Sequence, residues 1–202
     1  MADPDFKPIS TLSYFANEQD MLNAKINDKK TTFQAEIQPT DDQYLFLYDE
    51  TTLQKVFEPL QFHLHAPSEH TFNGKHYDLE LHIVHKNPNA TELSVIGIFF
   101  DRVAGGNTSN WFIEELLKDS EEKGSSYWVA PKLNVKRLVD GLDNQRIFHY
   151  DGSLTTPGCS EIVQWIVVDD PQPISEKQLK FFTSRWAGNP SFARGRGNNR
   201  AT

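Results

Sequence analysis

The sequence has a single cysteine, Cys159, so a disulfide within one chain is excluded. Because no apolar run approaches the roughly 20 residues that cross a bilayer, we expect no membrane-spanning helix. Met1 to Asp5 carry neither the basic nor the apolar stretch of a secretory leader, and we expect no signal peptide within this sequence. Basic residues are also few. A net charge of -8 argues against nucleic-acid binding, because phosphate contact needs clustered cations.

Aromatic and alternating residues are abundant, and they predict one strand-rich domain. The 202 residues include 14 Phe and 4 Trp, enough bulky side chains for a sizeable core. We expect a single domain over residues 1–202, with 1–6 as a leader and 193–202 as a tail. Apolar–polar alternation predicts six strands. They are Phe33 to Ile37, Tyr44 to Tyr48, Gln54 to His65, Asp78 to His85, Leu93 to Phe100 and Ile162 to Val168.

Helical patterns are fewer. An apolar stripe predicts a helix over Trp111 to Lys118. A second helix is predicted over Ser175 to Ser184, because Ser175 and Gln178 form a capping-box pair at its start. The pattern as a whole indicates a mixed α/β domain in which strands dominate.

Six of the seven histidines lie in one short stretch, from His63 to His85. Side chains of a strand alternate between its two faces. A strand over residues 61–65 therefore puts His63 and His65 on one face, with Phe62 and Leu64 on the other. The strand thus presents two imidazoles side by side.

The later strand supplies a third imidazole. Its alternation puts Glu80 and His82 on one face. The connection between the two strands contains Asn73-Gly74, a turn pair suited to an antiparallel hairpin. Pairing of the strands would bring His82 beside the other two histidines. Three imidazoles from two rigid strands predict a zinc site with a fourth position open to water.

Polar neighbours separate this pattern from a structural histidine pair. Gln61 and Glu80 each lie two residues from a candidate ligand, on the same face. Zinc-bound histidines normally donate their second N–H to such acceptors. A His-x-His pair alone is more often structural, and the matched acceptors favour the metal site. His85 falls on the apolar face and is predicted to be structural, whereas His76 in the turn is predicted to be solvated.

Several long motifs, in order, resemble those of the alpha-class carbonic anhydrases. They are Gln61 to His70, Glu80 to His85, Leu93 to Phe99, Tyr150 to Pro157 and Trp165. The resemblance implies a large, mostly antiparallel twisted central sheet with short peripheral helices. It also implies Zn²⁺ as the cofactor, reversible hydration of carbon dioxide to bicarbonate and a proton by zinc-bound hydroxide, and inhibition by sulfonamides and anions.

By the same resemblance, Thr155 and Glu69 are the catalytic pair. An ionised glutamate only accepts hydrogen bonds, so Thr155 must donate its hydroxyl hydrogen to Glu69. The Thr155 oxygen can then accept only from a zinc ligand that still carries a hydrogen. His70 and Tyr150 are implied to support the metal site from behind. The residues implied to contact or enclose the substrate are Val84, Val95, Leu154, Thr156, Val163 and Trp165.

The chain departs from the family pattern in two ways that affect function. The proton-shuttle histidine of the family falls at Thr31, and no histidine precedes His63, so we expect slow, buffer-dependent turnover. Cys159 matches a half-cystine of secreted members whose partner segment is absent here, so it could instead link a homodimer. This match and the sequons at Asn89 and Asn107 favour a secreted glycoprotein. A cytoplasmic protein with a free thiol is the alternative.

A second function stays open at this stage. The fold could serve as a carbonic anhydrase-like binding, matrix or storage domain with weak or no catalysis. Such domains typically lack one or more of the ligand histidines, and this sequence has all three.

Overall fold

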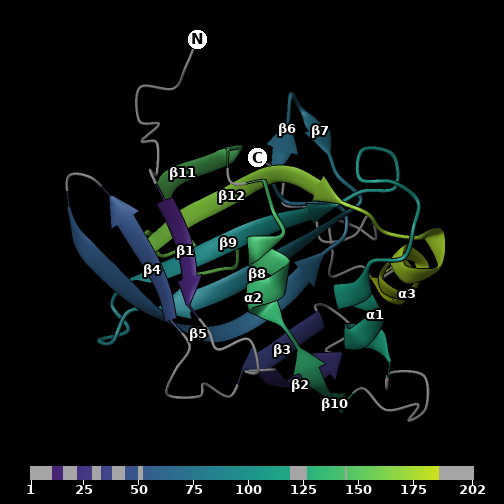
Figure 1. Ribbon diagram of the computed structural model, residues 1–202, viewed down its shortest axis with the longest axis horizontal. Coiled ribbons are helices and arrows are strands. Elements are labelled where there is room, and N and C mark those ends of the chain that lie inside the picture. The colour runs from purple at the N-terminus through teal and green to yellow at the C-terminus, as the bar shows by residue number, and fades with distance from the viewer. Residues whose placement is uncertain are drawn as a thin grey trace.

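The computed structural model describes residues 11–15, 22–28, 33–37, 44–49, 52–118, 127–143 and 145–186. A twisted ten-stranded sheet crosses the molecule (Figure 1). Its strands are β1 (Thr11–Phe15), β2 (Leu22–Asp28), β3 (Phe33–Ile37), β4 (Tyr44–Asp49), β5 (Thr52–His65), β8 (Leu79–Lys86), β9 (Leu93–Phe100), β10 (Tyr127–Leu133), β11 (Ile147–Gly152) and β12 (Val163–Gln172). Outside this sheet lie the hairpin β6 (Thr71–Phe72) and β7 (Lys75–His76) and the helices α1 (Trp111–Leu117), α2 (Val135–Asp140) and α3 (Glu176–Trp186).

The strand order places β5 and β8 side by side in the middle of the sheet. The order is β10-β2-β3-β5-β8-β9-β12-β11, and β4 pairs with both β1 and β5. The pairs are antiparallel except for β9 with β12, which run parallel. The expectation of a large, mostly antiparallel twisted sheet with short peripheral helices is therefore confirmed.

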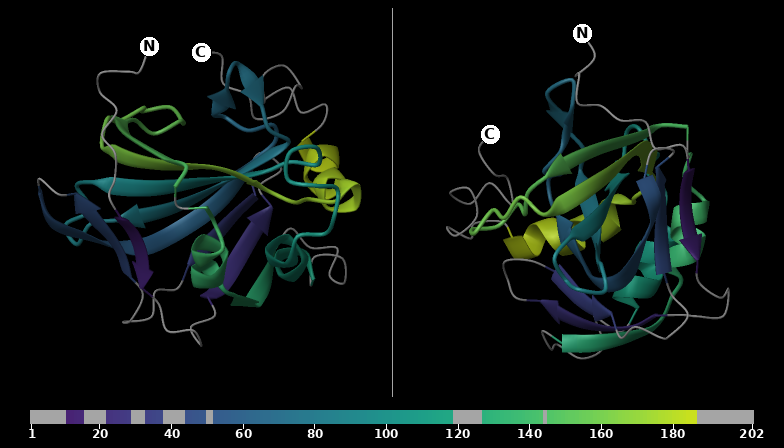
Figure 2. Two further views of the ribbon diagram at one scale, coloured as in Figure 1. Left: turned by 45° about the horizontal axis from the view of Figure 1, so that its top comes forward. Right: turned by 90° about the vertical axis from the view of Figure 1, so that its left-hand side faces the viewer.

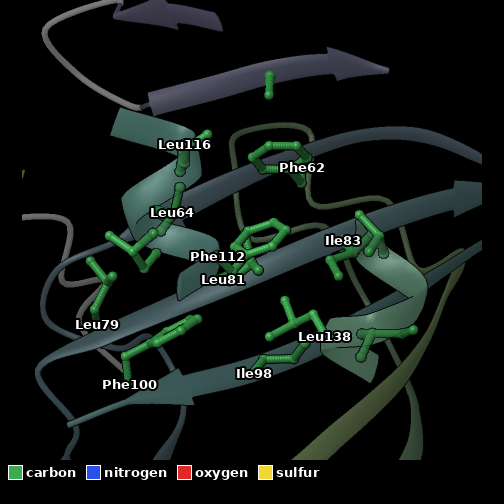
Figure 3. Close-up of a cluster of buried hydrophobic side chains, with 14 of the residues drawn as sticks. Phe62, Leu64, Leu79, Leu81, Ile83, Ile98, Phe100, Phe112, Leu116 and Leu138 are labelled. Atoms are coloured by element: carbon green, nitrogen blue, oxygen red, sulfur yellow. The ribbon is translucent and has the colours of Figure 1, made fainter. Parts of the chain in front are cut away.

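One face of the sheet carries the main hydrophobic core, because every second residue of the central strands is large and apolar. Phe62, Leu64, Leu81 and Ile98 are fully buried there (Figure 3). Phe112 of α1 and Leu138 of α2 belong to the same cluster. These helices lie below the sheet in the left view of Figure 2. The opposite face of β5 and β8 is left for the polar residues of the candidate site.

Side-chain caps fix the helices. Asn110 accepts hydrogen bonds from the backbone N–H groups of Phe112 and Ile113 at the start of α1. At α3, Ser175 Oγ accepts from Gln178 N at 3.3 Å and Gln178 Oε1 accepts from Ser175 N at 3.2 Å. The capping box predicted from the sequence is confirmed.

The structure differs from the sequence-based expectation at several places. The Asn73-Gly74 turn closes the small β6–β7 hairpin and is only part of the longer connection from β5 to β8. Both turn residues have positive φ, 51° and 73°, as the tight turn requires. Strands β1, β2, β6, β7, β10 and β11 and helix α2 were not predicted. Helix α2 has only six residues, too few to show a helical stripe. Within the described residues, no helix is long and apolar enough to cross a membrane.

Candidate metal centre

The register of β5 and β8 brings three imidazoles together. His63 lies directly opposite His82, and His65 lies opposite Glu80. Directly opposed side chains of an antiparallel pair share a face, and diagonal neighbours remain within reach of long side chains. The ring centroids are 4.8 Å apart for His63 and His65, 5.1 Å for His63 and His82, and 4.5 Å for His65 and His82. One nitrogen from each ring falls in a group within 4.8 Å.

Gln61 and Glu80 fix the orientation of the His63 and His82 rings. His63 Nδ1 lies 3.0 Å from Gln61 Oε1, and His82 Nε2 lies 2.7 Å from Glu80 Oε1. Because both oxygens accept, these ring nitrogens carry the hydrogens, and the other nitrogen of each ring carries a lone pair. These are His63 Nε2 and His82 Nδ1, which lie 3.3 Å apart.

This facing pair of nitrogens fits a bound cation. Two lone pairs at this distance repel unless a positive charge lies beside them. A proton on His63 is disfavoured, because burial and the neighbouring His82 lower the pKa of this imidazole to about 3. Two nitrogens that each lie 2.0–2.1 Å from a tetrahedral zinc ion are about 3.3–3.4 Å apart. The separation found here, 3.3 Å, matches that geometry.

His65 completes the group from inside the site. The residue is 3 % exposed, and its Nδ1 lies 3.5 Å from Glu69 Oε1. Glu69 Oε2 in turn lies 4.0 Å from His82 Nδ1. The carboxylate of Glu69 therefore lies next to two of the three imidazoles.

Glu80 is the centre of the hydrogen bonding around the imidazoles. Its carboxylate is fully buried and accepts four hydrogen bonds. Oε1 accepts from His82 and from His70 Nδ1 at 2.6 Å, and Oε2 accepts from the backbone N–H groups of Glu69 and His70 at 2.8 and 2.9 Å. Burial alone would raise the pKa of Glu80. The electrostatic effect of the neighbouring His82 and the hydrogen bonds from His70 and His82 outweigh burial and hold the pKa well below its usual range.

A further hydrogen bond extends this arrangement to β11. His70 Nε2 lies 2.6 Å from the Tyr150 hydroxyl, and the Tyr150 ring stacks on Trp165 at a centroid distance of 6.3 Å. Burial lowers the pKa of His70, but its hydrogen bond to Glu80 and the Glu80 charge outweigh this, and the net shift is upward. Burial raises the pKa of Tyr150 above its ordinary value.

The side chains of Thr155 and Glu69 interact, although they come from distant parts of the chain. The Thr155 hydroxyl donates to the Glu69 carboxylate. Burial raises the pKa of Glu69, and this effect exceeds the lowering by His82 and by the Thr155 hydrogen bond. Thr155 is half-buried and Thr156 is exposed.

The apolar residues expected to enclose the substrate form one cluster beside His82. Val84, Val95, Val163 and Trp165 are each at most 5 % exposed, and Leu154 packs against them. The Trp165 ring lies 4.8 Å from that of His82. One apolar wall and three imidazoles therefore occupy the same side of the sheet.

The remaining residues singled out in the sequence have the following positions. His85 is fully buried on the core face, where burial lowers its pKa to about 4. His76 is exposed, as predicted, and its Nδ1 also lies 2.6 Å from Ser68 O. Cys159 is an exposed free cysteine. Thr31 and residues 1–6 and 193–202 lie outside the described residues. Asn89 and Asn107 are exposed, and secretion and glycosylation stay predictions.

Sequence reasoning missed the backbone donors to Glu80. The N–H groups of Glu69 and His70 are polar partners that no side-chain pattern reveals. The one available indication was the carboxylate itself, because a buried charge needs several donors.

Fold and site together define a class of protein in which a large mixed sheet carries a candidate three-histidine metal centre on neighbouring strands. A family model described as eukaryotic-type carbonic anhydrase matches residues 1–199, and the chain belongs to this family.

Individual relatives agree with this assignment. The chain is 36 % identical over 135 residues to a carbonic anhydrase of Nostoc sp., covering 66 % of this chain and 48 % of the relative. The alpha-carbonic anhydrase of Thermovibrio ammonificans in complex with sulfanilamide is 31 % identical with a TM-score of 0.72, covering 89 % of this chain and 72 % of that one. A carbonic anhydrase of Chlamydomonas reinhardtii in complex with acetazolamide is 29 % identical with a TM-score of 0.75, covering 99 % and 81 %. The chain spans about half the length of the curated relatives it matches, 48 % for the first two.

Proposed function

We propose that this chain catalyses the reversible hydration of carbon dioxide to bicarbonate and a proton, with His63, His65 and His82 holding Zn²⁺. The observation that supports this most directly is the 3.3 Å separation of His63 Nε2 and His82 Nδ1 within a group of three imidazoles. When bound, zinc acts as a Lewis acid that lowers the pKa of water to about 7, as is established for carbonic anhydrases.

The residues around the metal position would orient the attacking oxygen and the imidazole rings, and they offer an apolar surface to the substrate. Because Thr155 donates to Glu69, its oxygen can accept only from a group that carries a hydrogen, which would orient the attacking oxygen. Val84, Val95 and Trp165 offer apolar surface to a substrate that has no charge and no hydrogen-bond donor. Gln61 and Glu80 hold the imidazole rings in the orientation that directs one lone pair of each toward the ion.

The test is a stopped-flow measurement of carbon dioxide hydration, with and without a sulfonamide, together with elemental analysis for zinc. We expect one zinc ion per chain and hydration that a sulfonamide abolishes. A chain that contains no zinc and whose residual rate is insensitive to the sulfonamide would instead be a binding, matrix or storage domain.

Turnover is expected to depend on buffer. No histidine precedes His63 in the sequence, so the family's shuttle position cannot pass a proton to solvent at neutral pH. At saturating carbon dioxide, the hydration rate should rise several-fold with imidazole concentration and then level off. At low carbon dioxide, where proton transfer does not limit the rate, imidazole should have little effect. A high rate at saturating carbon dioxide that is independent of imidazole would contradict this prediction.

We also propose that Cys159 can link two chains. Its thiol is exposed, and the sequence offers no second cysteine for an internal disulfide. Under oxidising conditions we expect a species of doubled mass in denaturing electrophoresis without reductant. Cys159→Ser should remain monomeric in the same gel. A species of doubled mass that persists in Cys159→Ser would show that another surface joins the chains.

A further inference from the structure

Strand β9 contains a glycine, Gly97, in its interior. Gly97 lies in the middle of a strand whose flanking residues, Ile96 and Ile98, are fully buried. It pairs with His82 on one side and with Val167 on the other. A glycine inside a strand contributes no packing and costs conformational entropy, and it often marks a close approach of another group. The φ of Gly97 is not among the positive values of the chain, so backbone conformation does not require glycine here.

The space beside Gly97 is taken by a carboxylate oxygen. A Cβ atom at position 97 would lie 3.0 Å from Glu80 Oε1, closer than real Cβ contacts normally come. Its next neighbours are Val167 Cγ2 at 3.7 Å and Ile166 O at 3.9 Å, both at ordinary contact distance. The conflict therefore involves one atom, and that atom is the hydrogen-bond partner of His82 Nε2.

Glu80 has little freedom to move away. Its two oxygens accept four hydrogen bonds in a fully buried position, two from imidazoles and two from backbone N–H groups. A shift of Oε1 by a few tenths of an ångström would lengthen or bend the bond to His82. Because that bond sets the orientation of the His82 ring, the shift would change where Nδ1 points.

We propose that Gly97 is a positioning residue, whose missing side chain leaves the room in which Glu80 Oε1 holds His82 in the orientation for metal binding. The zinc-binding consequence rests on the proposed function. The hydrogen-bond consequence does not, because it concerns only residues that are present without metal.

The test is a double-mutant cycle on zinc affinity, measured by competition with a chelator. Gly97→Ala should weaken zinc binding about tenfold, within the 10–100-fold range typical of outer partners of metal ligands. Glu80→Asp withdraws the carboxylate by one methylene and should weaken binding by itself. In the Glu80→Asp background, Gly97→Ala should lower zinc affinity less than about twofold, because no carboxylate oxygen then occupies the space of the added methyl group.

Ile98→Val is the matched control. It removes one buried methyl group from the next residue of β9, which belongs to the main core and pairs with Leu81 instead of Glu80. We expect a lower melting temperature and unchanged zinc affinity. The control separates a general loss of stability from the specific loss of the Glu80–His82 hydrogen bond.

A second readout uses the metal-free protein. The His82 Nε2 proton, hydrogen-bonded to Glu80, should give a downfield, slowly exchanging imidazole resonance in nuclear magnetic resonance spectra. In Gly97→Ala this resonance should move upfield and exchange faster, whereas in Ile98→Val it should be unchanged. If the wild-type chain bound no zinc at all, the proposed function would fail, and this resonance would still decide the role of Gly97.

Three results would overturn the inference. They are an equal cost of Gly97→Ala in the Glu80 and Glu80→Asp backgrounds, an equal loss of zinc affinity in Ile98→Val, and a His82 resonance unchanged by Gly97→Ala. Should Gly97→Ala fail to fold, the double variant decides. Folding restored by Glu80→Asp supports the inference, and folding not restored overturns it.

Discussion

His82→Ala should abolish stoichiometric zinc binding and with it carbon dioxide hydration. His82 faces His63 across the β5–β8 pair and is nearest to His65, so it contacts both other members of the group. Loss of a ligand should lower zinc affinity by more than the 10–100-fold typical of outer partners. The measurement is zinc content after dialysis, followed by stopped-flow hydration.

This variant also removes one of the four donors to the buried Glu80 carboxylate. We therefore expect a loss of about 1–3 kcal/mol in the free energy of unfolding, measured by urea denaturation. His76→Ala is the matched control, because His76 is an exposed histidine of the same segment. It should keep zinc and activity. Full zinc occupancy in His82→Ala would contradict the assignment of the ligands.

Thr155→Ala should lower kcat/KM for hydration about 100-fold while zinc stays bound. The Thr155 hydroxyl donates to Glu69 and does not belong to the imidazole group. Under the proposed function, its removal would leave the attacking oxygen without the acceptor that orients it, and misorientation at a reacting centre can cost about 10²-fold. The expected result is a slow enzyme with a full complement of metal.

Thr155→Ser provides the matched control for this prediction. It keeps the hydroxyl group and removes only a methyl group, so it should restore most of the rate. A wild-type rate in Thr155→Ala would show that the hydrogen bond to Glu69 is not used in catalysis. Loss of zinc from Thr155→Ala would place Thr155 in metal binding instead.

The placement of the three histidines could be predicted from the sequence because strand geometry is regular. Alternation around residues 61–65 and 79–85 assigned each side chain to a face. In the structure His82 lies beside His63, directly opposite it in the strand register, and His85 is fully buried on the face of Ile83. The face on which each side chain lies depends only on the two-residue alternation of a strand, and tertiary contacts do not change this alternation.

Other parts of the site could not be predicted from pattern. The hydrogen bond between Thr155 and Glu69 joins segments far apart in the chain, and only the family resemblance pointed to it. The backbone donors to Glu80 depend on the turn that follows β5. Strand β11 was missed because it lies at the sheet edge, where residues such as Phe148 and Tyr150 remain more than a third exposed. A signal for Gly97 was present in the sequence as an isolated glycine within an apolar strand.

The central pairing of β5 with β8 has a consequence for how the site assembles during folding. His63 and His82 are 19 residues apart in the chain, so their approach closes a short loop. His70 and Tyr150 are 80 residues apart, and three strands, β8, β9 and β12, lie between β5 and β11 in the sheet. Closing the longer loop costs more chain entropy. The imidazole group therefore needs the closure of a shorter loop than the part of the site contributed by β11, and its assembly costs less chain entropy.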